Sequence, residues 1–224
     1  MASYRVCTTP DSLQAAADVL LQHSHIILDC EGHSLGEAGG KLSLLNLGVS
    51  HEDDGGDEHL SIFVIDVLAF QNDKAKHLIP IFDILKSENI FKIVFDGRMD
   101  SSELLHGHGI KLNNVLDLQL ADISSREKRG EGIDRQLRRL QGFLPRYELA
   151  RNPAMYSSVQ KLNGMASAAR EYDIQGANKR GEHCRALIPL FGIVHPDYLR
   201  RRPWQVAQTA HGQNLPSLRS RGHL

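Results

Sequence analysis

Two carboxylates separated by one residue, Asp29 and Glu31, are the side chains best placed for chemistry in this sequence. They follow Ile26-Ile27-Leu28, an apolar run typical of a short strand that is buried on both faces. Because side chains alternate across a strand, both carboxylates should point to the same side, about 7 Å apart along the backbone. Burying a charged carboxylate against apolar neighbours costs free energy, so water or a cation should solvate both groups. A strand end that frays into a polar loop is the alternative.

A third acid near these two would favour a metal site, and Asp100 is the best candidate. It follows the apolar segment 91–95 by a short turn and opens a predicted helix, so its side chain can point back over the sheet edge. The alternative role for Asp100 is an N-terminal helix cap. Asp96 is a further option as a ligand. Asp117, at a predicted strand end, is expected to support the site or to cap the next helix.

The spacing of apolar residues predicts the elements that position these acids. Strands are predicted at 26–31, 42–49, 60–67, 91–95 and 115–117, and helices at 10–21, 73–88, 100–108, from 118, 134–144 and 155–172, with a loop at 124–134. The first three strands, joined by turns, predict an antiparallel meander. The later alternation of helices and strands predicts parallel pairing, so the expected fold class is α/β, a mixed sheet flanked by helices. We expect a domain at 1–180 and an irregular tail at 181–224.

Composition limits the function classes. The chain has 224 residues, of which 41% are hydrophobic, and this suits a single globular domain. It contains no run of about 18 apolar residues and no signal pattern at its start, so we expect an intracellular protein of the cytoplasm or nucleus. Three scattered cysteines suggest a reducing compartment, and His183-Cys184, the only adjacent pair of potential zinc ligands, does not predict a zinc site.

Charge is divided along the chain. Residues 1–123 hold 8 Lys and Arg against 19 Asp and Glu, a net charge of −11, and residues 124–224 hold 18 against 8, a net charge of +10. The basic half could form one face that binds nucleic acid. Its candidate phosphate contacts are Arg135, Arg138 and Arg139, with Lys128 and Arg129 upstream. The alternative is that these residues form a solvated helix face.

Three blocks of sequence resemble the DEDD 3′–5′ exonuclease superfamily, in the branch that holds ribonuclease D and the Werner-type exonuclease domain. Residues 26–32 with 42–47 resemble the first motif of the family and its second strand. Residues 91–104 resemble its second motif, and residues 110–121 resemble the stretch that follows. The resemblance covers roughly residues 10 to 175. The order and spacing of three blocks make it far more specific than Asp-x-Glu alone.

The resemblance implies a ribonuclease H-like fold and hydrolysis of phosphodiester bonds from the 3′ ends of single-stranded RNA or DNA. It assigns Asp29 and Glu31 to the first motif and Asp100 to the second, as catalytic residues that hold two Mg²⁺ or Mn²⁺ ions. The third motif of the family, a Tyr or His followed by a fourth Asp, is not found, since no acid follows Gln205. A weak or inactive exonuclease-fold protein that binds RNA or acts as a scaffold, with one metal ion or none, is therefore the alternative.

Overall fold

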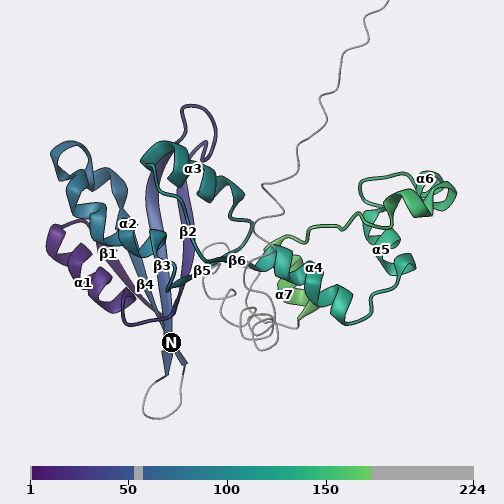
Figure 1. Ribbon diagram of the computed structural model, residues 1–224, viewed down its shortest axis with the longest axis horizontal. Coiled ribbons are helices and arrows are strands. Elements are labelled where there is room, and N and C mark those ends of the chain that lie inside the picture. The colour runs from purple at the N-terminus through teal and green to yellow at the C-terminus, as the bar shows by residue number, and fades with distance from the viewer. Residues whose placement is uncertain (1, 53–57, 173–224) are drawn as a thin grey trace, which may run out of the picture.

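One mixed sheet of six strands organises the chain, with the spatial order β1-β4-β3-β2-β5-β6. The structure is a computed structural model that describes residues 2–52 and 58–172 (Figure 1). The strands are β1 (Ala2–Cys7), β2 (His25–His33), β3 (Lys41–Glu52), β4 (Glu58–Asp66), β5 (Phe91–Val94) and β6 (Val115–Asp117). The antiparallel pairing of β2 with β3 and of β3 with β4 confirms the predicted meander. The pairing of β2 with β5 and of β5 with β6 is parallel, so the predicted mixed sheet is confirmed.

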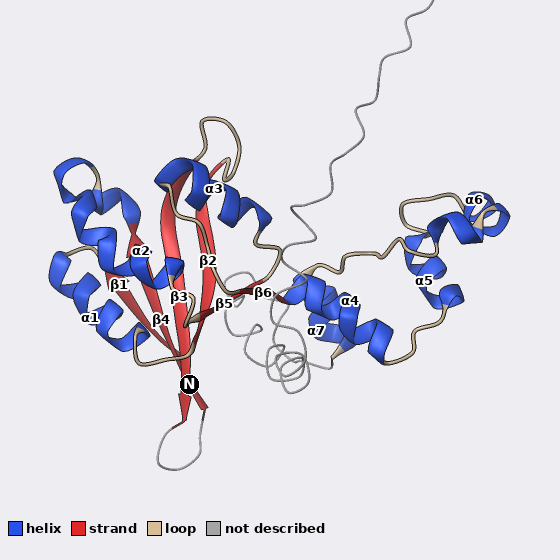
Figure 2. Cartoon of the chain, viewed as in Figure 1, coloured by secondary structure: helices blue, strands red, loops and turns tan. Residues whose placement is uncertain are grey.

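The helices that follow the first strands pack on one face of the sheet (Figure 2). They are α1 (Pro10–Leu20), the 3₁₀ segments η1 (Val67–Phe70) and η2 (Asn72–Leu78), α2 (Ile79–Lys86) and α3 (Arg98–His108). Thr9 caps α1 and Pro10 occupies its first turn, which confirms the predicted helix start. α3 ends at Gly109, whose φ of +68° lies in the left-handed region that favours glycine, as predicted. The main apolar core lies between these helices and the sheet.

The sequence analysis did not predict β1. Tyr4 and Val6 are exposed and Cys7 is buried, so the segment lacks the one-sided apolar pattern of a strand. It pairs as a parallel edge strand beside β4, and of its described side chains only Cys7 enters the main core. A strand of this kind has no strong side-chain signal.

The segment after β6 folds differently from the prediction. Its helices are α4 (Leu118–Lys128), α5 (Ile133–Leu140), α6 (Arg146–Arg151), η3 (Pro153–Tyr156) and α7 (Met165–Glu171). The predicted loop at 124–134 is wrong for residues 124–128, because α4 continues to Lys128 with Arg126 paired to Asp122 one turn earlier, and only residues 129–132 connect α4 to α5 as a loop. The single helix predicted at 155–172 is also wrong, because an extended stretch that includes the buried Asn163 separates η3 from α7.

None of the helices in the described ranges is long and apolar enough to cross a membrane. The end of the predicted 1–180 domain and all of the predicted 181–224 tail lie outside the described residues, as do His183 and Cys184. The absence of the third motif after Gln205 also concerns residues outside that range.

Candidate metal and catalytic site

β2 brings Asp29 and Glu31 to one face of the sheet. Ile26, Leu28 and Cys30 of this strand belong to the core beneath the helices, and Ile27 belongs to a smaller apolar cluster on the opposite face. Because side chains alternate along a strand, Asp29 and Glu31 lie on the same side as Ile27. Asp29 is partly buried and Glu31 is exposed, so the strand leads from the core into solvent at this point.

Asn46 of β3 lies directly opposite Asp29 in the antiparallel ladder. Its Nδ2 donates a hydrogen bond to Asp29 Oδ2 over 3.3 Å. An amide donor at this position restricts the orientation of the Asp29 carboxylate.

The turn between β5 and α3 brings Asp100 toward β2. Asp96 has a φ of +57°, a conformation that Asp tolerates better than most residues. The Asp117 carboxylate accepts hydrogen bonds from Asp96 N (3.1 Å), Gly97 N (3.2 Å) and Gln119 N (2.9 Å). Asp117 therefore caps α4 and holds the turn before α3, which confirms the capping role expected from the sequence.

Charge repulsion shows that the three acids are neighbours. Burial first, and then the carboxylates of Asp29, Glu31, Asp96 and Asp117, together raise the pKa of Asp100 to about 7. Burial, followed by the carboxylates of Asp100, Asp29, Glu103 and Glu31, also raises the pKa of the Cys30 thiol. Asp100 therefore lies in the electrostatic field of both Asp29 and Glu31.

The carboxylate oxygens around Asp100 are the chemical type of ligand that a hard divalent cation prefers. Carboxylate oxygens are the ligands that Mg²⁺ and Mn²⁺ prefer, and a cation would relieve the repulsion around Asp100. Within residues 2–52 and 58–172, however, no three His, Cys, Asp or Glu side chains converge closely enough to form a ready metal shell. Binding would require the carboxylates to draw together around the ion.

Glu103 fixes the distance between the two elements that carry the acids. Its carboxylate is 5% exposed and accepts hydrogen bonds from Gly36 N (3.0 Å) and Leu42 N (3.1 Å). Ser102 Oγ donates to the Gly36 carbonyl over 3.1 Å. These bonds join α3 to the loop between β2 and β3. Sequence reasoning missed Glu103, although its place one residue before the buried Leu104 puts it on the inner side of α3.

Gly36 allows this contact. Its φ is +71°, and a Cβ atom there would lie 2.9 Å from the Met99 carbonyl oxygen. Any other residue would push the loop away from α3. The loop, Glu103 and Ser102 therefore form one clamp, which we call the α3 clamp.

The structure separates the three candidate phosphate contacts of α5. Arg139 is ion-paired to Glu131 (Nε to Oε1, 2.7 Å) and to Glu171 (Nη2 to Oε1, 2.7 Å). Arg138 is exposed, and Arg135 is exposed with its Nε 3.9 Å from Glu131 Oε2. Arg139 thus joins α5 to α7, and the other two arginines face solvent.

A family model described as 3′–5′ exonuclease matches residues 4–147, more than half of the chain. The chain belongs to this family of 3′–5′ exonucleases. Members of the family typically use divalent metal ions. The match spans β1 to the start of α6, so it includes Asp29, Glu31, Asp100 and the α3 clamp.

Several solved exonuclease structures are similar to this chain. RNase D of Trypanosoma brucei in complex with RNA U12 has 22% sequence identity and a TM-score of 0.48, over 87% of this chain and 63% of that one. RNase D of Escherichia coli, an exoribonuclease involved in structured RNA processing, has 19% identity and a TM-score of 0.48, over 86% of this chain and 44% of that one. The EXD2 exonuclease domain has 18% identity and a TM-score of 0.45, over 77% of this chain and 95% of that domain. This chain thus spans less than two thirds of the T. brucei enzyme. No relative was found among curated proteins.

Proposed function

We propose that this chain is a metal-dependent exonuclease that removes nucleotides from the 3′ end of single-stranded RNA or DNA. The observation that carries the proposal is the proximity of the Asp29 and Glu31 carboxylates to Asp100, whose pKa is raised to about 7, first by burial and then by these and the neighbouring charges. Family membership supports the same reaction.

In this proposal Asp29, Glu31 and Asp100 hold one or two Mg²⁺ or Mn²⁺ ions. Bound there, such ions lower the pKa of a water molecule and stabilise charge on the phosphate oxygens. Asn46 keeps the Asp29 carboxylate in one orientation through its 3.3 Å hydrogen bond. Asp117 holds the turn that presents Asp100, and the α3 clamp keeps α3 against the loop after β2. Without a cation, the pKa of Asp100 is raised to about 7, so its carboxylate binds a proton at a higher pH than an isolated aspartate does.

A shortening assay tests the proposal. The full chain is incubated with single-stranded RNA and DNA labelled at the 5′ end, with Mg²⁺, with Mn²⁺ or with EDTA. We expect a ladder of shortened products with either metal and none with EDTA or when the 3′ end is blocked. If the wild-type chain shortens neither strand more than Asp29→Asn does, it is not an exonuclease.

A second candidate function is binding without cleavage. It is favoured because no three ligating side chains in the described parts of the chain form a ready shell, and because the sequence contains no recognisable third motif. Salt-sensitive binding of single strands with no shortening would support this candidate. Undetectable binding at low salt would exclude it.

We also propose an intracellular location, in the cytoplasm or nucleus. Cys7 and Cys30 are both buried free thiols, as expected in a reducing compartment. Fluorescence microscopy of the tagged chain in its own cells tests this, and recovery of the chain from the secreted fraction would contradict it.

A further inference from the structure

The segment 133–162, which we call the arm, lies away from the sheet. It contains α5, α6 and η3, and Figure 1 shows α5 and α6 on the far side of α4 and α7 from the strands. The arm holds 6 Lys and Arg against 2 Asp and Glu, a net charge of +4. Residues 1–123 carry −11, so a polyanion is repelled by the sheet region and attracted to the arm.

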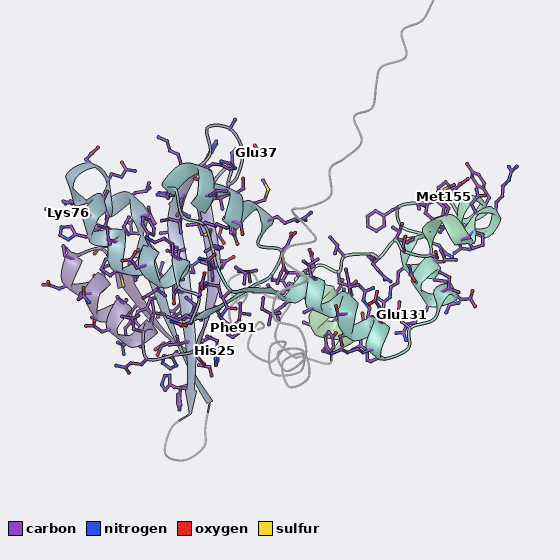
Figure 3. The ribbon with its side chains drawn as sticks, viewed as in Figure 1. His25, Glu37, Lys76, Phe91, Glu131 and Met155 are labelled. Carbon is purple, nitrogen blue, oxygen red and sulfur yellow. The ribbon has the colours of Figure 1, made fainter. Side chains whose placement is uncertain are left out.

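Two aromatic side chains are almost fully exposed on the arm. Phe143 is 71% exposed and Tyr147 is 72% exposed. Lys161 Nζ lies 5.8 Å from the centre of the Phe143 ring, so a cation flanks one aromatic face. Arg151 lies one turn after Tyr147 on α6, and the two residues therefore share a helix face. Figure 3 shows side chains projecting into solvent around Met155 in this region.

The backbone beneath these side chains is held in place. Gln136 is buried, and its Nε2 donates to the carbonyls of Tyr156 (3.3 Å), Ser157 (2.8 Å) and Val159 (2.8 Å). Arg139 ties α5 to Glu131 and Glu171. The exposed aromatic and cationic side chains are therefore presented by an internally bonded scaffold rather than by an isolated helix.

We propose that the arm binds single-stranded nucleic acid at a site separate from the acidic cluster. Bases stack on Phe143 and Tyr147, and phosphates pair with Arg146 and Arg151, which are exposed next to them. Stacking on an aromatic ring suits any base, so this contact holds the strand without reading its sequence. The inference rests on the proposed function in one respect: the bound strand is the one whose 3′ end reaches Asp29, Glu31 and Asp100.

The arm proposal is tested by strand affinity, measured by fluorescence anisotropy of a labelled 20-nucleotide single strand with the full chain in EDTA. The double variant Phe143→Ala/Tyr147→Ala should bind at least about tenfold more weakly than wild type. The control is Tyr4→Ala, which removes a tyrosine that is 53% exposed on β1, and its affinity should be unchanged. Arg146→Gln/Arg151→Gln should weaken binding and reduce its salt dependence. Phe143→Tyr should retain the affinity, because it keeps an aromatic face.

Each other result has a distinct meaning. If wild type and Phe143→Ala/Tyr147→Ala bind the long strand equally, the arm proposal is overturned and the proposed function stands. If wild type binds no strand at low salt in EDTA, the arm proposal is overturned, and the shortening assay with Mg²⁺ or Mn²⁺ decides the proposed function separately. If sedimentation shows a wild-type dimer that the double variant loses, with strand affinity unchanged, the arm is a contact between two copies of the chain and the proposal is overturned. Hydrolysis of a four-nucleotide strand should be the same in both proteins, because both keep the acids on the sheet and differ only in the arm, which lies beyond α4 and α7.

Discussion

Asp100 carries the clearest electrostatic signature of the site. An isolated aspartate ionises near pH 4, but burial and four neighbouring carboxylates bring the pKa of Asp100 to about 7. In the absence of a cation, Asp100 therefore binds more protons in the folded chain than in the unfolded chain between about pH 4 and pH 7. By linkage, the contribution of Asp100 to stability falls as the pH rises through this window. In the proposed site, these acids bind a cation at some cost to the stability of the metal-free fold.

Replacing Asp100 with Asn should therefore stabilise the metal-free protein. At pH 8 in EDTA we expect Asp100→Asn to unfold with a free energy about 1–2 kcal/mol higher than wild type, because the substitution removes one of the opposed charges. At pH 4 the two should be nearly equal. Urea unfolding at both pH values measures the difference, and a variant less stable than wild type at pH 8 would contradict this account.

Arg139 joins two helices through ion pairs, although the sequence suggests a solvent-exposed arginine. The sequence places it with Arg135 and Arg138 as a phosphate contact, but its guanidinium pairs with Glu131 and Glu171. The hydrogen bond from Arg139 lowers the pKa of Glu131.

We expect Arg139→Met to lower the free energy of unfolding by about 2 kcal/mol, because two carboxylates lose their partner. The matched control Arg138→Met, on the exposed side of the same helix, should leave stability within about 0.5 kcal/mol of wild type. Thermal melts compare the two variants. Equal stability of the two would show that the Arg139 ion pairs contribute nothing.

At the scale of elements, the α3 clamp connects the strand that carries Asp29 and Glu31 to the helix that carries Asp100. Glu103 is not one of the proposed metal ligands. We expect it to act by positioning α3, and with it Asp100, relative to β2. Its two hydrogen bonds with Gly36 N and Leu42 N are buried and charge-assisted. A change there should affect stability and metal affinity together.

Glu103→Gln should cost about 1–3 kcal/mol of unfolding free energy, because an amide can accept only one of the two hydrogen bonds and buries its own donors. It should also weaken Mn²⁺ binding several-fold. The control Glu88→Gln changes an exposed glutamate and should alter neither quantity. Urea unfolding and Mn²⁺ titration of both variants measure the effects, and normal Mn²⁺ affinity in a folded Glu103→Gln would remove the positioning role.

Lys92 is a charged residue inside β5. It is fully buried, its Nζ donates to the carbonyls of Ser87 and Ile90, and burial lowers its pKa to about 8. Between about pH 8 and pH 10.5 the unfolded chain therefore binds more protons at this residue than the folded chain. By linkage, the destabilising contribution of Lys92 is present below pH 8 and fades as the pH rises to 10.5.

The stability of wild type relative to Lys92→Met should therefore rise by roughly 3 kcal/mol between pH 8 and pH 10.5. Comparing the two proteins cancels the titration of other groups. Urea unfolding at intervals of half a pH unit measures the difference. Parallel profiles for the two proteins would show that the buried amine keeps its ordinary pKa.

At the scale of the whole molecule, the sequence predicted the sheet region better than the helical region. β2 to β6, α1 and α3 carry strong apolar periods and turn residues such as Pro10 and Gly109, so local patterns were sufficient. α4 and α7 depend on contacts between distant residues instead. Asp122 accepts hydrogen bonds from Asn163 Nδ2 (3.0 Å) and Tyr172 Oη (3.1 Å), and these polar residues resemble a loop in sequence.

The candidate site also combines residues that local sequence patterns indicate with residues whose roles depend on distant contacts. Asp29, Glu31 and Asp100 were found from strand and turn patterns together with the family resemblance. Glu103 was missed because its partners are backbone N–H groups more than sixty residues away, which no sequence spacing reveals. The role of Arg139 was also hidden, since Glu171 lies on a separate helix. Long-range polar pairing, rather than apolar patterning, is what the sequence did not disclose.

Mn²⁺ binding by the full chain tests the central claim, that Asp29, Glu31 and Asp100 form a cation site, most directly. Isothermal titration at pH 8 should show wild type binding Mn²⁺, with affinity reduced at least about tenfold in Asp29→Asn and in Asp100→Asn. Asp11→Asn, which changes an exposed acid in the first turn of α1, should bind Mn²⁺ as wild type does. Equal affinity in all four proteins, or no binding by wild type, would contradict the account.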